Sequence, residues 1–197
     1  YEQWGVDLLQ RVRGMFTFVI WDKNKQELFG ARDHFGIKPF YYAKMNGTFM
    51  YASEIKSLLR HPDFVKELNA EALKPYMTFQ YPAIGETFFK GVYKLPEGHY
   101  FTYRDGKMDI HRYYDEDFRE GKQKLGELVN SIDQTVCDSV KAHQIADVEV
   151  GSFLSSGVDS SYVAAVARPQ HTYSIGFGKG TYNESQQAGE LAELLKL

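Results

Sequence analysis

Short apolar runs separated by turn-forming residues fill the first half of the chain, and this pattern predicts antiparallel strands joined by hairpins. "GMFTFVIWD" (14–22) is a nearly continuous apolar run rich in aromatic and β-branched residues, which predicts a strand buried on both faces. Asn46-Gly47 and Asp105-Gly106 each lie between two such runs and are strong hairpin signals. The predicted hairpins cover residues 14–33, 38–53 and 98–114.

Two short helices are expected between these hairpins. Ser53 is the predicted cap of the first helix, which presents Ile55 and Leu58 on one face. Asn69 is the predicted cap of the second helix, and Pro75 inside that pattern is expected to kink or shorten it.

The composition changes at residue 115, where "DEDFREGKQ" is charged and nearly free of large apolar groups, as in an exposed linker. This change predicts two domains, residues 1–118 and 119–197.

In the second domain, apolar residues recur at helical spacing from Leu125 to Ile145 and predict an amphipathic helix of about five turns. Strands and helices alternate after it, which predicts a parallel sheet of the doubly wound type. The strands are expected at 148–154 and 171–177, and the helices at 160–167 and 183–195.

Composition narrows the function classes. The chain has 43% hydrophobic and 25% charged residues, which is typical of a soluble globular protein. Its formal charge of -3, with basic and acidic residues interleaved, gives no broad attraction for nucleic acid. No apolar stretch is long enough to span a bilayer, so a membrane is not an expected partner. The single Cys137 suits a reducing compartment and predicts a cytoplasmic location, and its place beside Val136 indicates a small buried hydrophobe.

In the stretch "GSFLSSGVDSS" (151–161), an apolar strand is followed by small residues that lead into a helix. In a doubly wound sheet, ligands bind at such strand-to-helix turns. Small residues at 155–157 let backbone amides approach an anion, and the hydroxyls of Ser155, Ser160 and Ser161 can donate to phosphate oxygens. Asp159 would repel phosphate unless a cation lies between them, which favours Mg²⁺. The alternative is a plain serine-rich turn in which Asp159 stabilises the first helical turn.

This loop has neither the glycine spacing of a dinucleotide fingerprint nor the Gly-Lys-Ser/Thr ending of a Walker A loop. Residues 155–160, "SSGVDS", resemble the S-G-G-x-D-S loop of the N-type ATP pyrophosphatases, with Ser156 in place of the first glycine. If that position required a positive φ, serine would distort the loop.

The resemblance extends over nearly the whole chain. "RGMFTFVIWD", "FGARDHFGIKPFYY", "YASEIKSLL", "LPEGHY" and "VGSFLSSGVDSS" follow one another in the order found in the glutamine-dependent asparagine synthetases of the B type. The resemblance implies the C-terminal part of an N-terminal-nucleophile glutaminase domain over 1–118, an αββα sandwich with antiparallel sheets. It implies the N-terminal part of a parallel-sheet α/β synthetase domain of the ATP pyrophosphatase kind over 119–197.

In that family, ATP activates the side-chain carboxylate of aspartate as β-aspartyl-AMP with release of pyrophosphate. Glutamine, or free ammonia, then supplies the amide nitrogen. The resemblance thus implies a carbon-nitrogen ligase that uses ATP and Mg²⁺, and it allows a homodimer. The family's N-terminal cysteine nucleophile matches a position before "GMFTF", and its aspartate-binding residues match positions after Leu197. We therefore expect an incomplete, inactive fragment with no catalytic residue of its own.

The resemblance carries a set of ATP-binding positions over to this chain. The loop is the expected pyrophosphate cradle, with Asp159 as the Mg²⁺ ligand, and the other members are expected to contact adenosine. For Leu154, plain strand core is an equally good reading. The expected ATP-binding residues are Phe153, Leu154, Ser155, Ser156, Gly157, Val158, Asp159, Ser160 and Ile175.

The first domain also carries residues that could be mistaken for a site. Arg32, Asp33 and His34 belong to a segment that the resemblance implies is scaffold, and His34 is expected to be a turn residue. For Met15 and Phe16 the resemblance allows a place along the ammonia passage, but core packing is the expected arrangement.

Two alternative functions remain open. One is another ATP-dependent amide-forming enzyme on the same scaffold, either β-lactam synthetase-like or peptide-cyclising, with a different carboxylate substrate. The other is a non-catalytic interaction module in which Ser156 marks a decayed loop.

Overall fold

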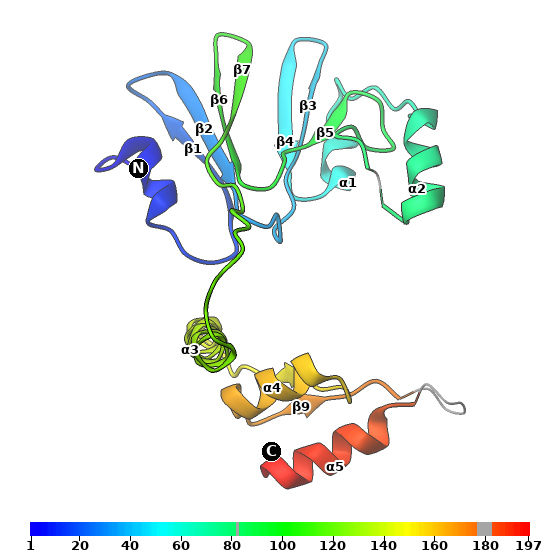
Figure 1. Ribbon diagram of the computed structural model, residues 1–197. Coiled ribbons are helices and arrows are strands. Elements are labelled where there is room, and N and C mark those ends of the chain that lie inside the picture. The colour runs from blue at the N-terminus through cyan, green and yellow to red at the C-terminus, as the bar shows by residue number, and fades with distance from the viewer. Residues whose placement is uncertain (82, 177–182) are drawn as a thin grey trace. The chain divides into compact units, whose positions relative to one another are not determined.

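The computed structural model describes residues 1–81, 83–176 and 183–197, which form two compact units, Tyr1–Phe118 and Arg119–Leu197 (Figure 1). Among the described residues, no helix is both long and apolar enough to cross a membrane.

Unit 1 (Tyr1–Phe118) contains two antiparallel sheets and a few short helices (Figure 1). The first sheet has the strand order β1-β2-β6-β7, and the second has the order β4-β3-β5. The strands are β1 Thr17–Asp22, β2 Glu27–Arg32, β3 Tyr41–Met45, β4 Thr48–Ala52, β5 Val92–Lys94, β6 His99–Arg104 and β7 Lys107–Arg112. The helical segments are η1 Gly5–Gln10, α1 Ile55–Leu58, η2 Ala70–Ala72 and α2 Leu73–Phe79, of which η1 and η2 are 3₁₀ turns. The three predicted hairpins are therefore confirmed.

The two sheets share one aromatic core. Phe40, Leu95 and Phe101 are fully buried between them, and Phe49 of β4 stacks on Tyr103 of β6 with ring centroids 4.2 Å apart. On the outer face of the first sheet, η1 packs its buried leucines against Phe29. On the outer face of the second sheet, α1 packs through Leu58. Unit 1 is thus layered as helical turn, sheet, sheet and helix.

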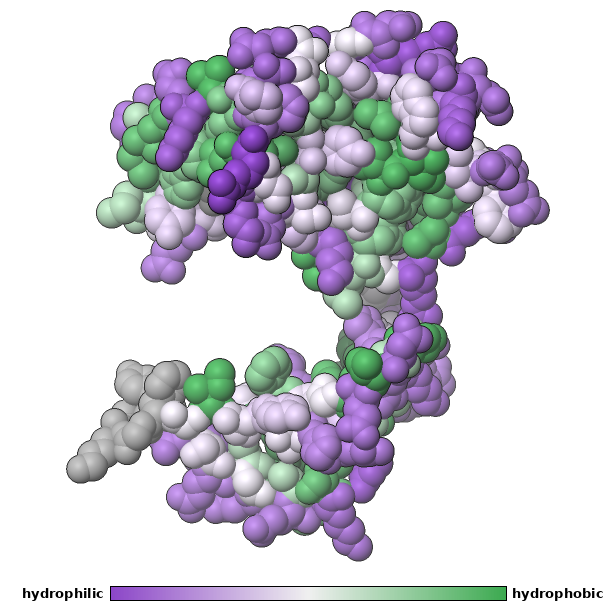
Figure 2. All heavy atoms as spheres, turned by 180° about the vertical axis from the view of Figure 1, so that it is seen from behind, coloured by the Kyte–Doolittle hydropathy of each residue, from purple (hydrophilic) through white to green (hydrophobic). Residues whose placement is uncertain are grey.

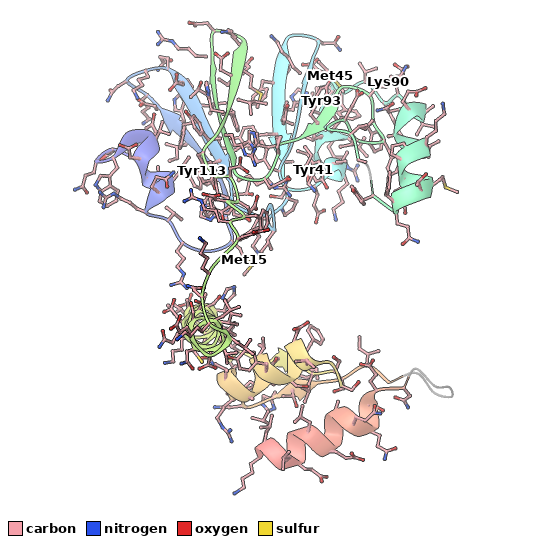
Figure 3. The ribbon with its side chains drawn as sticks, in the orientation of Figure 1. Met15, Tyr41, Met45, Lys90, Tyr93 and Tyr113 are labelled. Carbon is pink, nitrogen blue, oxygen red and sulfur yellow. The ribbon has the colours of Figure 1, made fainter. Side chains whose placement is uncertain are left out.

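Several local expectations are wrong in detail. The run 14–22 forms an edge strand, since β1 pairs only with β2, and Trp21 is 49% exposed rather than buried. Met15, on the segment before β1, is exposed, whereas Phe16 packs against the core (Figure 3). Apolarity alone predicts burial on both faces, but the position of a strand in its sheet is decided by its pairing partners.

Of the two predicted helix caps, one is wrong and one is confirmed. Glu54, not Ser53, is the N-cap of α1, and it makes no side-chain capping bond. Asn69 does cap η2, because its Oδ1 accepts the Glu71 N–H at 3.2 Å. Pro75 lies in the first turn of α2, where an N–H has no partner within the helix, so it is accommodated there.

A buried guanidinium and a buried carboxylate fix the connection from β2 to β3. Arg32 and Asp33 are 2% and 1% exposed. Arg32 donates from Nε to the Lys38 carbonyl and from Nη1 to the Leu95 carbonyl, both at 2.7 Å, and also to the Gly36 carbonyl. Asp33 accepts the N–H groups of Ile37 and Lys38, both at 2.9 Å. These two residues are structural.

Unit 2 (Arg119–Leu197) contains α3 Leu125–His143, β8 Ser152–Phe153, α4 Val158–Ala167, β9 Thr172–Tyr173 and α5 Ser185–Leu195 (Figure 1). β8 and β9 pair in parallel, and Leu154, Ala164 and Ala188 form the small core beneath them. The strands expected at 148–154 and 171–177 are each reduced to two residues, and Phe177 lies outside the described residues. Only this parallel pair of the expected doubly wound sheet is present in the described part of unit 2.

Large apolar side chains reach the surface in unit 2, as the green spheres of Figure 2 show. Leu125, Val129 and Ile132 line the apolar stripe of α3 and are exposed. The apolar face of α3 is therefore largely uncovered in the described structure.

Gly30 provides a sharp test of the first sheet. It lies opposite Phe101 in the β2·β6 pairing, and a Cβ built there would be 2.3 Å from Cε1 of the Phe101 ring. We expect Gly30→Ala to destabilise unit 1 by about 1–3 kcal/mol, because the ring would have to leave its rotamer. Urea unfolding followed by tryptophan fluorescence reports on this unit, since Trp4 and Trp21 both lie in it.

Gly85→Ala is the matched control, because a Cβ at Gly85 meets nothing within 4 Å and its φ is not positive. We expect this control to stay within about 0.5 kcal/mol of the wild-type chain. Equal unfolding midpoints for the two variants would contradict the packing argument.

Asp33 makes the stability of unit 1 depend on pH. Burial acts to raise the pKa of Asp33, but the backbone N–H groups of Lys38 and Ile37 stabilise the charged form and bring the net pKa below its ordinary value. A carboxyl with a lowered folded-state pKa stabilises the fold above its unfolded pKa, and this contribution is lost as pH falls through the folded pKa. We expect Asp33→Asn to cost about 1–3 kcal/mol near neutral pH.

The same substitution should flatten the acid limb of the stability profile, measured as unfolding midpoint against pH. Asp105→Asn is the control, because Asp105 is exposed in a turn with φ of 50°, a conformation that asparagine tolerates. An unchanged acid limb in Asp33→Asn would rule out this role for the carboxyl.

Candidate functional site

The serine-rich loop joins β8 to the N-terminus of α4, where the resemblance placed a phosphate cradle. Gly157 is the N-cap of α4, and the helix begins at Val158. The N–H groups of residues 158–160 have no acceptor among the residues that the structure describes, as is usual in a first helical turn. This end of the helix therefore offers both free donors and the positive end of the helix dipole to an anion.

Three consecutive loop amides are occupied by acceptors from the protein itself. Ser155 N–H donates to Ser160 Oγ at 3.2 Å, and Gly157 N–H donates to Ser155 Oγ at 3.1 Å. The two serine hydroxyls lie 2.8 Å apart. Between these amides, Ser156 N–H donates to the carboxylate of Glu184 at 3.4 Å. The loop is a set of donors whose present acceptors could be exchanged for phosphate oxygens.

The replacement of the first loop glycine by Ser156 causes no backbone strain in this structure. Ser156 is absent from the residues with positive φ, and Gly157 has a φ of -72°. A Cβ at Gly157 would nevertheless lie 3.2 Å from Ser155 Oγ. The glycine that the sequence retains is thus the one that makes a close approach.

A pocket of about 350 Å³ adjoins the loop between the ends of the two parallel strands. It brings together five of the nine predicted site residues. Its lining residues are Phe153, Leu154, Ser155, Ser160, Tyr173, Ser174, Ile175 and Glu184. Phe153, Tyr173 and Ile175 are exposed and give the pocket apolar walls, whereas Leu154 is buried and also belongs to the core. An apolar pocket beside an anion-binding loop suits a nucleoside phosphate.

The other predicted residues flank this pocket. Ser156, Gly157, Val158 and Asp159 are exposed along the loop and the first turn of α4. Asp159 is exposed and forms no hydrogen bond or ion pair with the rest of the described chain. No group of three or more metal-ligating side chains occurs among the described residues. A metal ion here would need oxygen ligands from a bound phosphate as well.

Glu184 was missed by sequence reasoning. It precedes α5 and lies 28 positions from Ser156, so no local motif links it to the loop. One general rule could have pointed to it: in parallel sheets, ligands bind beyond the carboxyl ends of the strands, where the following helices begin. Glu184 lies at such a helix start, after the second strand.

Cys137 differs from its expected role. It is half-buried, and its Sγ lies 3.9 Å from the carboxylate of Asp133 rather than in an apolar setting. The same carboxylate accepts a hydrogen bond from the Tyr162 hydroxyl, which raises the pKa of Tyr162 to about 12. This cluster links α3 to α4 and lies outside the pocket lining.

The residues predicted as scaffold in unit 1 do not form a site. His34 stacks on Tyr114 with ring centroids 4.1 Å apart. Tyr113 donates its hydroxyl to the Arg32 carbonyl at 2.8 Å, and burial raises its pKa to about 12 (Figure 3).

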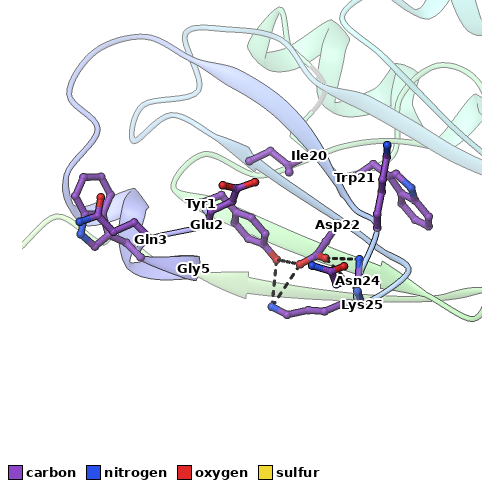
Figure 4. Close-up of a pocket in the computed structure, with 11 residues that line it drawn as sticks. Tyr1, Glu2, Gln3, Gly5, Ile20, Trp21, Asp22, Asn24 and Lys25 are labelled. Carbon is purple, nitrogen blue, oxygen red and sulfur yellow. Dashed lines mark hydrogen bonds and ion pairs between the residues drawn. The ribbon is translucent and has the colours of Figure 1, made fainter.

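A wider depression of about 1080 Å³ lies in unit 1 beside η1 and the β1–β2 turn (Figure 4). Three of its polar residues interact: Tyr1 donates from its hydroxyl to Asp22, and Lys25 lies 3.7 Å from the same carboxylate. None of the predicted site residues lines it.

The family is shown by comparison with known proteins. Residues 1–114, more than half of the chain, match the family described as "Glutamine amidotransferase domain", and the chain belongs to this family. Residues 131–197 match the family described as "Asparagine synthase". The resemblance seen in the sequence is thus confirmed for both units.

Curated relatives carry both regions. The chain is 39% identical to the glutamine-hydrolysing asparagine synthetase 1 of Bacillus subtilis strain 168, over 99% of this chain and 32% of that protein. It is 37% identical to a putative glutamine-hydrolysing asparagine synthetase of Mycobacterium bovis, over 99% of this chain and 32% of that protein. The chain therefore spans about a third of the length of the curated relatives it matches.

Among solved structures, the glutamine phosphoribosylpyrophosphate amidotransferase of B. subtilis, complexed with ADP and GMP, matches at 16% identity and a TM-score of 0.35. The match covers 88% of this chain and 35% of that chain. A TM-score this low carries no weight for the fold.

The loop geometry predicts unequal roles for two neighbouring serines. Both hydroxyls lie within hydrogen-bonding distance of the Gly157 carbonyl, at 3.1 Å for Ser160 and 2.7 Å for Ser161. Only Ser160 also lines the pocket and contacts the Ser155 hydroxyl. We expect Ser160→Ala to weaken binding of inorganic pyrophosphate by about tenfold, the value of one hydrogen bond to a charged group. Ser161→Ala should change it by less than about twofold.

Isothermal titration of the intact protein with pyrophosphate and Mg²⁺ measures both affinities. An equal loss of pyrophosphate affinity in the two variants would contradict a direct contact of Ser160 with phosphate, because both serines would then act only by stabilising the start of α4.

Proposed function

We propose that this chain is part of a glutamine-hydrolysing asparagine synthetase. The observation that carries the proposal is the loop at residues 155–160, with three consecutive amide donors, free helix N-terminal donors beyond them and an apolar-walled pocket beside it. Both family matches and the names of the curated relatives support the same assignment. In this proposal the protein is a ligase that forms a carbon-nitrogen bond with glutamine as nitrogen donor.

In this proposal the two units carry out different steps of the reaction. We assign residues 1–118 to the C-terminal part of the glutamine amidotransferase domain, which releases ammonia from glutamine. Residues 119–197 form the N-terminal part of the synthetase domain, which binds ATP. The substrates are ATP, aspartate and glutamine, or ammonia in its place.

In this proposal the nucleotide binds in the pocket and along the loop. Phe153 and Ile175 offer apolar surface to the adenosine, and Leu154 supports them from the core. The loop from Ser155 to Ser160 receives the phosphates through its amides and hydroxyls. Asp159 would hold Mg²⁺ together with phosphate oxygens, and the ion would neutralise the charge between the carboxylate and the phosphates.

In the proposed reaction the β and γ phosphates of ATP leave together as pyrophosphate. The aspartate side-chain carboxylate attacks the α-phosphorus, the bond from the α-phosphorus to the bridging oxygen breaks, and pyrophosphate leaves with that electron pair. Loop donors that face the developing negative charge stabilise this departure. Ammonia displaces AMP from the resulting β-aspartyl-AMP and gives asparagine.

A second candidate is a β-lactam synthetase-like or peptide-cyclising enzyme that uses the same loop and another carboxylate. The two candidates differ only in the carboxylate substrate, so aspartate dependence separates them. A homodimer and a cytoplasmic location remain predictions.

The test is pyrophosphate release by the intact protein with ATP, Mg²⁺ and ammonium, with and without aspartate. We expect release to require aspartate and to accompany asparagine formation. Asp159→Asn should lower the rate by at least about tenfold through loss of the metal ligand, whereas the exposed Asp147→Asn should leave it unchanged. Release that ignores aspartate would favour the second candidate, and no release would argue against a functional loop.

A further inference from the structure

Glu184 is the only charged side chain among the described residues that line the loop pocket. It is the N-cap residue of α5, and its carbonyl accepts the Ala188 N–H at 3.0 Å. Its Oε2 accepts the Ser156 N–H at 3.4 Å. The carboxylate thus extends from one helix end to the loop that precedes another.

The backbone around Glu184 is anchored, so the side chain is the part that can move. Asn183 Oδ1 accepts the N–H of Ser185 at 3.1 Å and its hydroxyl at 2.6 Å. The same two residues lie close to Gly176, three residues after β9, where a Cβ would be 3.4 Å from Ser185 Oγ and 3.5 Å from Asn183 Oδ1. The start of α5 thus lies beside the segment that follows β9, with the Glu184 carboxylate within reach of the loop.

The acceptor at Ser156 differs in kind from its neighbours. The amides of Ser155 and Gly157 donate to hydroxyls within the loop, which are neutral. Ser156 N–H donates to a carboxylate from another element, over a distance at the long end of the hydrogen-bonding range. A phosphate oxygen at the cradle would require the same N–H, and one N–H makes one strong hydrogen bond.

We propose that Glu184 is a positioning residue of the phosphate loop. Its carboxylate holds the Ser156 N–H while the loop is empty and gives it up to a phosphate oxygen when the nucleotide binds. The inference rests on the proposed function of the loop as a phosphate cradle. After displacement the carboxylate stays at the pocket wall, where it repels a bare polyphosphate more than one shielded by Mg²⁺. Glu184 therefore favours the metal complex of the nucleotide over the free anion.

The first experiment measures inorganic pyrophosphate binding to the intact protein by titration calorimetry, with Mg²⁺ and with EDTA. We expect Glu184→Gln to tighten metal-free binding by about fivefold or more, since about 1 kcal/mol of repulsion is removed, and to tighten Mg²⁺-pyrophosphate binding less. Glu190→Gln, on the exposed side of the same helix, is the matched control and should match the wild-type protein in both conditions. Weaker or unchanged metal-free binding in Glu184→Gln would overturn the inference.

The second experiment tests the hydrogen bond without any nucleotide. Amide hydrogen exchange at Ser156, read by NMR, should be several-fold faster in Glu184→Ala than in wild type or Glu190→Gln. Unchanged exchange overturns the inference whatever the binding data show. If wild type binds no pyrophosphate in either condition, the proposed function of the loop fails, and the exchange result still decides whether Glu184 holds Ser156.

Discussion

Two charged side chains that water barely reaches, Arg32 and Asp33, hold together the parts of unit 1 that the chain brings in from distant positions. Arg32 donates to the carbonyls of Gly36 and Lys38 within the β2–β3 connection and to the carbonyl of Leu95, which precedes β6. Asp33 accepts from the same connection through its side chain, and its carbonyl accepts the Gly98 N–H at 3.0 Å. Burying such groups is costly unless each donor and acceptor is satisfied, and here no buried side-chain polar atom of the described residues lacks a partner.

This constraint explains why the charges of that segment are not a site. A guanidinium that donates to three carbonyls has little capacity left for a ligand, and a carboxylate that accepts two backbone amides has its charge stabilised already. The loop of unit 2 is the opposite case. Its acceptors are two hydroxyls and one long contact to Glu184, all of which can be exchanged for an anion at small cost. This contrast between fully used and exchangeable hydrogen bonds is why we propose the loop, and not the Arg32–Asp33 segment, as the site.

The sheet core adds a second constraint, set by shape. Gly30 has no side chain because the ring of Phe101 lies directly over it, and the aromatic residues of both sheets pack around that ring. The absence of a side chain at Gly30 on β2 thus leaves room for the phenyl ring of Phe101 on the neighbouring strand β6. An isolated glycine in a strand pattern often marks such a close approach, but which ring fills the space depends on strand pairing.

The sequence by itself determined the local elements, and the chemistry proposed for the loop was read from it as well. Hairpins at Asn46-Gly47 and Asp105-Gly106 and the long amphipathic helix from Leu125 follow from turn residues and from hydrophobic spacing, which act over a few residues. The serine-rich loop was predicted because helix N-termini after strands bind anions whatever the surrounding fold.

Tertiary structure alone decided the rest. The edge position of β1, the burial of Arg32 and Asp33, and the contact of Glu184 with Ser156 each join residues far apart in the chain. Such contacts depend on which strands pair and which helix ends meet. Local patterns of apolar and polar residues do not encode these choices, because many pairings satisfy the same pattern equally well.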